Sequence, residues 1–153
     1  MSTLDRLTTD LTASMKARDA FRTNTLRQVI GAVRAAEKAG PVAVELDEEQ
    51  VQGVLASEVK KRRDSAQIYT DAHATERAET ETAEADLIET YLPAALDEAQ
   101  LDAVVADAVA ATGATGMKDM GTVMKAATAA ASGLGRVDGK ALSQRVRQAL
   151  QAL

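Results

Sequence analysis

The sequence predicts an all-α protein, with an N-terminal four-helix domain over residues 1–94 and a small C-terminal three-helix bundle over residues 95–153. Apolar side chains recur every three or four residues along most of the chain, which is the spacing of one helix face. Alanine, the strongest helix former, is abundant, and aromatic residues make up only 2%, which disfavours strands. The two prolines, Pro41 and Pro93, stand at borders between the periodic segments.

The first helix is expected over residues 3–18, with Ser2 or Thr3 as its N-cap. Its apolar face is formed by Leu4, Leu7, Leu11 and Met15. The second helix is expected over residues 20–39, with Asp19 as its N-cap and a glycine-proline pair after its end. Its apolar arc is formed by Leu26, Val29, Ile30 and Val33. On its flank three basic residues line up seven and four residues apart, namely Arg27, Arg34 and Lys38.

The third and fourth helices complete the first domain. The third is expected from Asp47 to about Thr70, because Asp47 and Gln50 form the pattern of a capping box. The fourth is expected over residues 75–92, with Thr75 as its N-cap and an acidic outer face. Its apolar positions lie near its end, at Leu87, Ile88, Tyr91 and Leu92.

The C-terminal domain begins with a second capping-box pattern, Asp97 with Gln100, and a helix to about residue 112. Six glycines then divide the remaining chain into short pieces: Gly113, Gly116, Gly121, Gly133, Gly135 and Gly139. Two further helices are expected over residues 117–131 and 139–152, and three short helices of this kind form a small bundle.

The net charge of −5 conceals a strong asymmetry along the chain. Residues 1–40 contain seven Lys or Arg and four Asp or Glu, whereas residues 41–112 contain five and seventeen. Residues 113–153 are basic again, with six Lys or Arg and two Asp or Glu. An acidic protein binds polyanions poorly in general, but a local basic surface can still contact a phosphate backbone.

The residue types exclude several kinds of chemistry. The chain has no cysteine, which removes disulfides, zinc–thiolate sites and thiol nucleophiles, and no sequence motif of a phosphate-binding loop or a hydrolase nucleophile occurs. We interpret His73, the single histidine, as a surface or helix-end residue. An acidic run is interpreted as a solvated helix face and consists of Glu76, Glu79, Glu81, Glu84, Asp86 and Glu89. We therefore expect no catalytic residue, no metal and no cofactor, and, because no apolar run could span a membrane, a cytoplasmic location.

The basic segment at residues 58–65 has two interpretations. Glu58 and Arg62 fall on the apolar side of the third helix, so a structural ion pair facing the core is expected there. Lys60, Lys61 and Arg63 are expected to point outward. They form either a secondary basic patch for RNA or a solvated helix face, and the sequence favours neither.

The segment at residues 133–140 precedes the last helix and also has two interpretations. Glycines permit tight turns, Asp138 can cap the helix, and positive charge gathers beside a helix N-terminus, whose free N–H groups favour anions. The segment therefore suits either a phosphate or a plain capping loop, with the capping loop slightly favoured by the residues alone.

Four segments resemble the YqeY family in order along nearly the whole chain: residues 58–65 (EVKKRRDS), 91–93 (YLP), 116–124 (GMKDMGTVM) and 135–140 (GRVDGK). The C-terminal half of this family is similar to the tail domain of GatB, the tRNA-binding subunit of Asp/Glu-tRNA amidotransferases. The resemblance implies a tail domain that engages structured tRNA through the basic residues of the matching segment and its flanks. These candidates are Lys118, Lys125, Arg136, Lys140, Arg145 and Arg147.

The resemblance leads to three hypotheses about function. The leading one is a non-catalytic, tRNA-interacting accessory protein, whose affinity is expected to be weak because residues 126–134 are rich in alanine where relatives carry more lysine. A rival is an adaptor whose acidic helices dock a translation or amidotransferase protein partner. The third is the carbon–nitrogen ligase activity, with glutamine as amide donor, with which family members are often labelled. We interpret that label as association with the amidotransferase, because its chemistry resides in parts that are not found in this sequence. The oligomeric state stays open.

Overall fold

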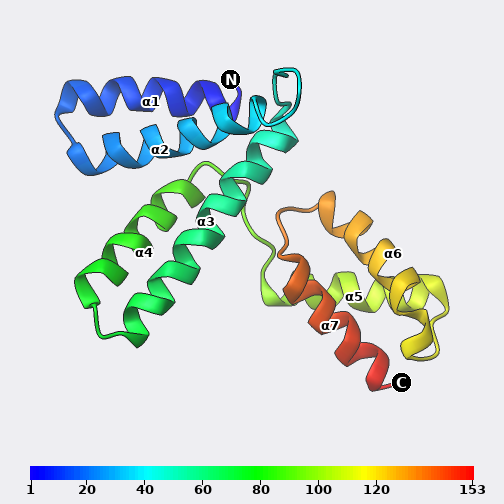
Figure 1. The fold of residues 1–153 in the computed structure, drawn as a ribbon. Helices are drawn as coiled ribbons and strands as arrows, with labels where there is room; N and C mark the ends of the chain where they lie inside the picture. Colours follow the sequence, from blue (N-terminus) through cyan, green and yellow to red (C-terminus); the bar gives the residue numbers. More distant parts are fainter. The chain divides into compact units, whose positions relative to one another are not determined.

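The computed structural model describes residues 1–153 and contains seven α-helices, one short 3-10 helix and no strand (Figure 1). The predicted all-α class is therefore confirmed. The chain packs into two compact units, Met1–Leu92 and Pro93–Leu153, which we call unit 1 and unit 2. None of the helices combines the length and the apolar character that crossing a membrane requires.

Unit 1 consists of two helical hairpins. Its helices are α1 (Thr3–Ala17), α2 (Ala20–Glu37), α3 (Glu48–Asp71) and α4 (Thr75–Glu89). Figure 1 shows α1 beside α2 and α3 beside α4. The predicted capping residues start three of these helices: Ser2 and Asp47 form capping boxes with Asp5 and Gln50, and the Asp19 carboxylate accepts a hydrogen bond from the Arg22 backbone N–H.

A single apolar core holds unit 1 together. Every one of its helices contributes to it: Leu7, Leu26, Val29, Val33, Val51, Leu55, Val59, Ala85, Ile88, Tyr91 and Leu92. Leu7, Leu26 and Leu55 are fully buried, and burial of each contributes about 1.5–3 kcal/mol to the stability of the fold.

Unit 2 has its own helices and its own core. They are α5 (Glu98–Thr112), the 3-10 helix η1 (Met117–Asp119), α6 (Met120–Ser132) and α7 (Gly139–Gln151). Asp97 and Gln100 form the predicted capping box, and Gly113 closes α5 with a left-handed φ of 64°. The core side chains are Leu96, Leu101, Val104, Val105, Ala108, Val123, Ala127, Ala131, Leu142, Val146 and Leu150.

Several helix ends differ from the prediction: α2 ends at Glu37 rather than at residue 39, and α4 begins at residue 75 as expected but ends at Glu89 rather than at residue 92. Thr75 does not cap α4: the cap position belongs to Ala74, whose backbone N–H bonds the Tyr69 carbonyl at 2.8 Å, so the turn after α3 sets where α4 begins. The helix predicted from residue 117 begins with a 3-10 turn, and its α-helical part starts at Met120.

The Asp119 carboxylate accepts a hydrogen bond from the Thr115 backbone N–H at 2.9 Å and holds the preceding loop against this turn. This hydrogen bond is the main reason that the pKa of Asp119 is lowered.

Candidate nucleic-acid interface

The loop before α7 is held by the chain that enters unit 2. The Arg136 backbone N–H donates to the Ala94 carbonyl at 3.1 Å, and the Leu96 N–H donates to the Arg136 carbonyl at 2.9 Å. These two bonds form one parallel bridge between Ala95 and Arg136. The predicted segment at residues 133–140 is therefore a fixed loop, tied to residues about forty positions earlier in the chain.

Gly135 is required by this pairing. A Cβ atom at this position would lie 2.8 Å from the Ala94 carbonyl oxygen and 3.2 Å from the Leu96 Cδ2 atom. The sequence suggested that the glycines of this segment serve tight turns, but the only glycine in the left-handed region of φ is Gly113. The reason for glycine at position 135 is instead the close approach of two backbone segments.

Asp138 caps α7, as predicted. Its carboxylate Oδ1 atom accepts a hydrogen bond from the Lys140 backbone N–H at 3.1 Å. The Lys140 side chain is exposed beside this helix N-terminus. The capping loop and a nearby cation are thus both present, in agreement with both interpretations of this segment.

Four of the six predicted cations of unit 2 are exposed and make no ion pair. They lie in η1, α6 and α7 and are Lys118, Lys125, Lys140 and Arg147. Lys140 and Arg147 are seven residues apart, so they lie two turns apart on the same face of α7. These side chains are available to a polyanion because none of them forms an ion pair; Lys118 interacts with the neighbouring Asp119 carboxylate only through its electrostatic field.

Arg145 and Arg136 are placed differently. The Arg145 guanidinium forms ion pairs with Glu98 and Asp102 on α5, and its side chain is 22% exposed. Arg145 thereby attaches α7 to α5. Arg136 is half-buried, and its backbone forms the bridge to Ala95. A role for either side chain in binding tRNA stays a prediction.

Arg62 connects three helices of unit 1. Its guanidinium bonds the carboxylates of Glu58 at 2.5 Å and Glu84 at 2.9 Å, and the side-chain oxygen of Gln28 at 2.8 Å. Burial alone would lower the pKa of Arg62, but the hydrogen bonds that its guanidinium donates to the two carboxylates outweigh burial and raise the pKa. The i, i+4 spacing on α3 pointed to the Glu58 contact. No signal in the sequence identified Glu84 on α4 or Gln28 on α2, because a single sequence does not show which helices pack together.

The cations of the secondary basic patch lie close to carboxylates. Lys60 bonds Asp64 at 2.8 Å, and the Lys61 Nζ atom lies 3.9 Å from Glu58. Arg63, which was expected to point outward, lies against α4. Its guanidinium bonds Asp86 at 2.7 Å and Glu89 at 3.0 Å, and the hydrogen bond to Asp86 is the main cause of the raised pKa of Arg63. The positive charge of this patch is therefore largely compensated within unit 1.

Sequence reasoning missed a polar cluster around Tyr91. The Tyr91 hydroxyl donates to the Asp10 carboxylate at 2.5 Å and accepts from the Arg22 guanidinium at 3.0 Å. The Arg6 guanidinium lies over the Tyr91 ring at 5.2 Å from its centre. Burial, followed by the hydrogen bond to Asp10, raises the pKa of Tyr91 to about 12. The cluster fixes the end of unit 1 to α1 and α2.

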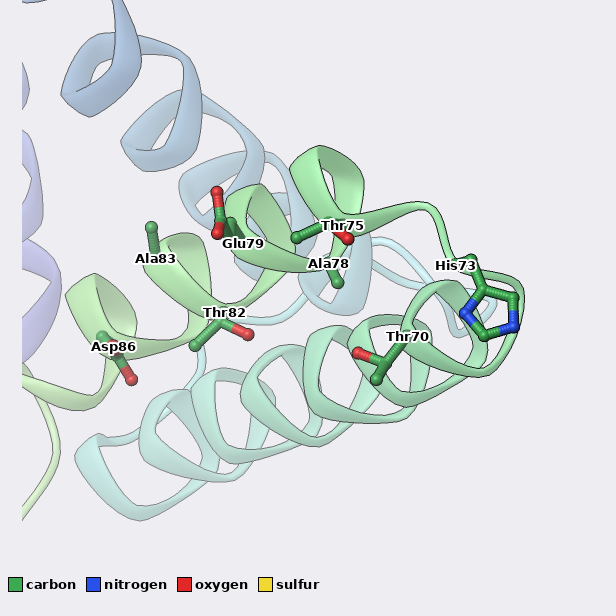
Figure 2. A pocket seen from close by; sticks show the side chains of 8 residues that line it. All are labelled: Thr70, His73, Thr75, Ala78, Glu79, Thr82, Ala83 and Asp86. Carbon is green, nitrogen blue, oxygen red and sulfur yellow. The ribbon is translucent and has the colours of Figure 1, made fainter.

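His73 lies at the turn between α3 and α4, in a left-handed conformation with φ 58°. It borders an open hollow of about 560 Å³ along α3 and α4. Figure 2 shows the imidazole at one end of this hollow and Asp86 at the other, with threonine side chains between them. Thr70 and Asp86 already bond Ala66 and Arg63, respectively. No group of three or more His, Asp or Glu side chains in the chain is arranged to hold a metal ion.

Comparison with known proteins identifies the family. No curated protein matches the sequence. The profile of the YqeY family, described as Yqey-like protein, matches residues 4–150, which include all the helices of both units except the first residue of α1 and the last residue of α7. The chain therefore belongs to the YqeY family.

Proposed function

We propose that this protein is a non-catalytic accessory protein that binds structured tRNA weakly and is related to the tail domain of GatB. The observation that carries the proposal is the set of four exposed, unpaired cations in unit 2, which are Lys118, Lys125, Lys140 and Arg147. In a chain of net charge −5, cations left without carboxylate partners mark where a phosphate backbone would be attracted. The similarity of residues 116–124 and 135–140 to the tail domain supports the same surface.

The proposal includes the organisation of the chain and its place in the cell. Unit 1 is a four-helix domain and unit 2 is a three-helix, tail-like domain that carries the tRNA contacts. The protein acts in the cytoplasm, where tRNA is found. Phosphate contacts release counterions, so binding is expected to weaken steeply as salt is added.

The proposal is tested by measuring the affinity of the full chain for fluorescently labelled bulk tRNA over a range of salt concentrations. Lys140→Ala with Arg147→Ala removes two unpaired cations from one face of α7. We expect the slope of log affinity against log salt to fall by about two, because each lost phosphate contact removes about one from the slope.

The matched control is Lys60→Ala with Lys61→Ala, which also removes two positive charges. Both lysines lie near carboxylates, at 2.8 Å and 3.9 Å, so their loss should leave the slope unchanged. If the two double variants weaken binding equally, net charge alone governs the interaction and the proposed surface is wrong.

A rival function, an adaptor that docks a translation or amidotransferase protein partner, is favoured by the acidic face of α4. Glu84, Asp86 and Glu89 are engaged by Arg62 and Arg63. Glu76 and Glu79 are exposed and make no ion pair. The rival predicts that a specific protein is recovered from native lysate after RNase treatment and is lost from the variant Glu76→Gln with Glu79→Gln. Recovery that disappears with RNase would support the tRNA proposal instead.

A further inference from the structure

The α1–α2 hairpin contains a hollow bordered by two arginines. It lies where the C-terminal end of α1 meets the first turns of α2 and has a volume of about 390 Å³. Its lining is Met15, Arg18, Ala20, Thr23, Asn24 and Arg27. Arg18 closes α1 in a left-handed conformation with φ 57°, and its backbone N–H bonds the Met15 carbonyl at 3.2 Å, so the base of this side chain is fixed at the hollow.

The two arginines of the hollow are not neutralised by the chain. Neither Arg18 nor Arg27 forms an ion pair. The nearby carboxylates are engaged elsewhere: Asp19 caps α2 at the Arg22 backbone N–H, and Asp10 bonds Arg22 and Tyr91. The Asn24 side-chain amide also bonds no other group of the protein. The hollow thus offers hydrogen-bond donors and positive charge, and no carboxylate lines it.

The positive surface continues along α2 from the hollow. Arg27, Arg34 and Lys38 follow at spacings of seven and four, so they lie on one face over a length of about 16 Å. All three are exposed, and Lys38 makes no ion pair, whereas Arg34 bonds Glu37 at 2.9 Å. Gly31 lies between them on the same face, with no atom within 4 Å of where its Cβ would be, so an elongated ligand could approach the helix closely.

The cations of unit 1 are divided unequally between its two hairpins. Those of α3 all lie near carboxylates, and Arg77 of α4 lies over the Tyr69 ring. The four lysines and arginines of unit 1 that contact neither a carboxylate nor a ring are Lys16, Arg18, Arg27 and Lys38. All four belong to the α1–α2 hairpin and its ends, so the uncompensated positive charge of unit 1 gathers there.

We propose that the α1–α2 hairpin is a second contact surface for the phosphate backbone of a structured RNA. One phosphate lies in the hollow between Arg18 and Arg27, and the backbone continues along α2 to Lys38. Guanidinium groups bind phosphate oxygens through two parallel N–H donors, and the regular spacing of the cations along α2 suits the repeating phosphates of a nucleic-acid backbone. The inference rests on the proposed function, because both surfaces would bind the same RNA through cations that form no ion pair within the protein.

The test uses the full chain and fluorescently labelled bulk tRNA. The variant is Arg18→Asn with Arg27→Gln, since asparagine tolerates the left-handed conformation of Arg18 and glutamine keeps the helix propensity at position 27. We expect the affinity for tRNA at low salt to be weaker by on the order of tenfold. The slope of log affinity against log salt should also be smaller by about two. Arg27→Gln alone should lose about one from the slope, so a folding defect at position 18 would not conceal the result. Wild-type affinity and slope in both variants would overturn the inference.

The proposed function and this inference fail in different ways. If Lys140→Ala with Arg147→Ala weakens binding but Arg18→Asn with Arg27→Gln does not, the inference is wrong and the proposed function stands. If only the α1–α2 variant weakens binding, the inference holds and the unit 2 surface is wrong. A third titration uses poly-L-glutamate as the probe. If Arg18→Asn with Arg27→Gln weakens binding of poly-L-glutamate but not of tRNA, the surface takes an acidic protein, which also overturns the inference.

Discussion

At the scale of single residues, the physical reason for a residue often lies in a contact that is distant in sequence. Gly135 is the clearest example, because its neighbour is the carbonyl of Ala94, about forty residues earlier. The sequence identified the glycine and its motif, but not this contact. A single sequence shows local spacing, and the bridge between Ala95 and Arg136 exists only after the bundle has formed.

Gly135→Ala should destabilise unit 2. The added methyl group would lie 2.8 Å from a backbone oxygen that cannot rotate away, so the paired segments must separate, at about 1–3 kcal/mol. Gly121→Ala is the matched control: it lies in α6 with nothing within 4 Å, and should stabilise the fold by about 0.5–1 kcal/mol. Urea unfolding of the full chain measures both changes. A Gly135→Ala variant as stable as wild type would contradict the explanation.

Tyr91 should make stability depend on alkaline pH. Its pKa is about 12 in the folded protein, against 10.0 ordinarily, so the folded state retains the phenol proton more tightly than the unfolded state. The contribution is complete below pH 10 and is lost as pH rises through about 12. The variant Tyr91→Phe should not show this part of the loss in the free energy of unfolding at alkaline pH. Absorbance titration of the two tyrosines should show one of them ionising near pH 12, and ionisation of both near pH 10 would refute the assignment.

At the scale of helices, the sequence predicted the elements well where local chemistry decides. The caps at Ser2, Asp19, Asp47, Asp97 and Asp138 are all confirmed. Thr75 was wrong as a cap, because the hydrogen bond from Ala74 to Tyr69 in the turn after α3 sets the start of α4. The sequence also did not predict contacts between helices: Arg63 was expected to point outward, but it bonds Asp86 and Glu89 on α4.

Arg62 links α2, α3 and α4 through the hydrogen bonds of its guanidinium. Arg62→Ala would leave Glu84 without its cation and Glu58 with only the exposed Lys61 at 3.9 Å, although the two carboxylate side chains are only 18% and 15% exposed. We expect a loss of about 3 kcal/mol in the free energy of unfolding. Lys61→Ala also removes a cation near Glu58, but Lys61 is 73% exposed and should change stability by less than about 0.5 kcal/mol. Equal effects in the urea midpoints of the two variants would show that Arg62 is not central to the packing.

At the scale of the whole molecule, composition predicted the all-α class and the separation of charge along the chain. Composition did not predict which cations lack a carboxylate partner and can therefore bind a polyanion. Of the predicted basic residues, Arg145 and Arg63 bond carboxylates on neighbouring helices, while Lys118, Lys125, Lys140 and Arg147 do not. This distinction depends on which helix faces meet, and all six predicted cations of unit 2 stay candidates for tRNA contacts.

The central claim is that unit 2 contacts tRNA through these unpaired cations. The most direct measurement is a titration of the isotope-labelled full chain with bulk tRNA at low salt, monitored by the backbone amide NMR signals. We expect signal changes that gather in residues 113–153, around Lys118, Lys125, Lys140 and Arg147, and that reverse as salt is added. Unchanged signals throughout residues 113–153 at low salt would contradict it.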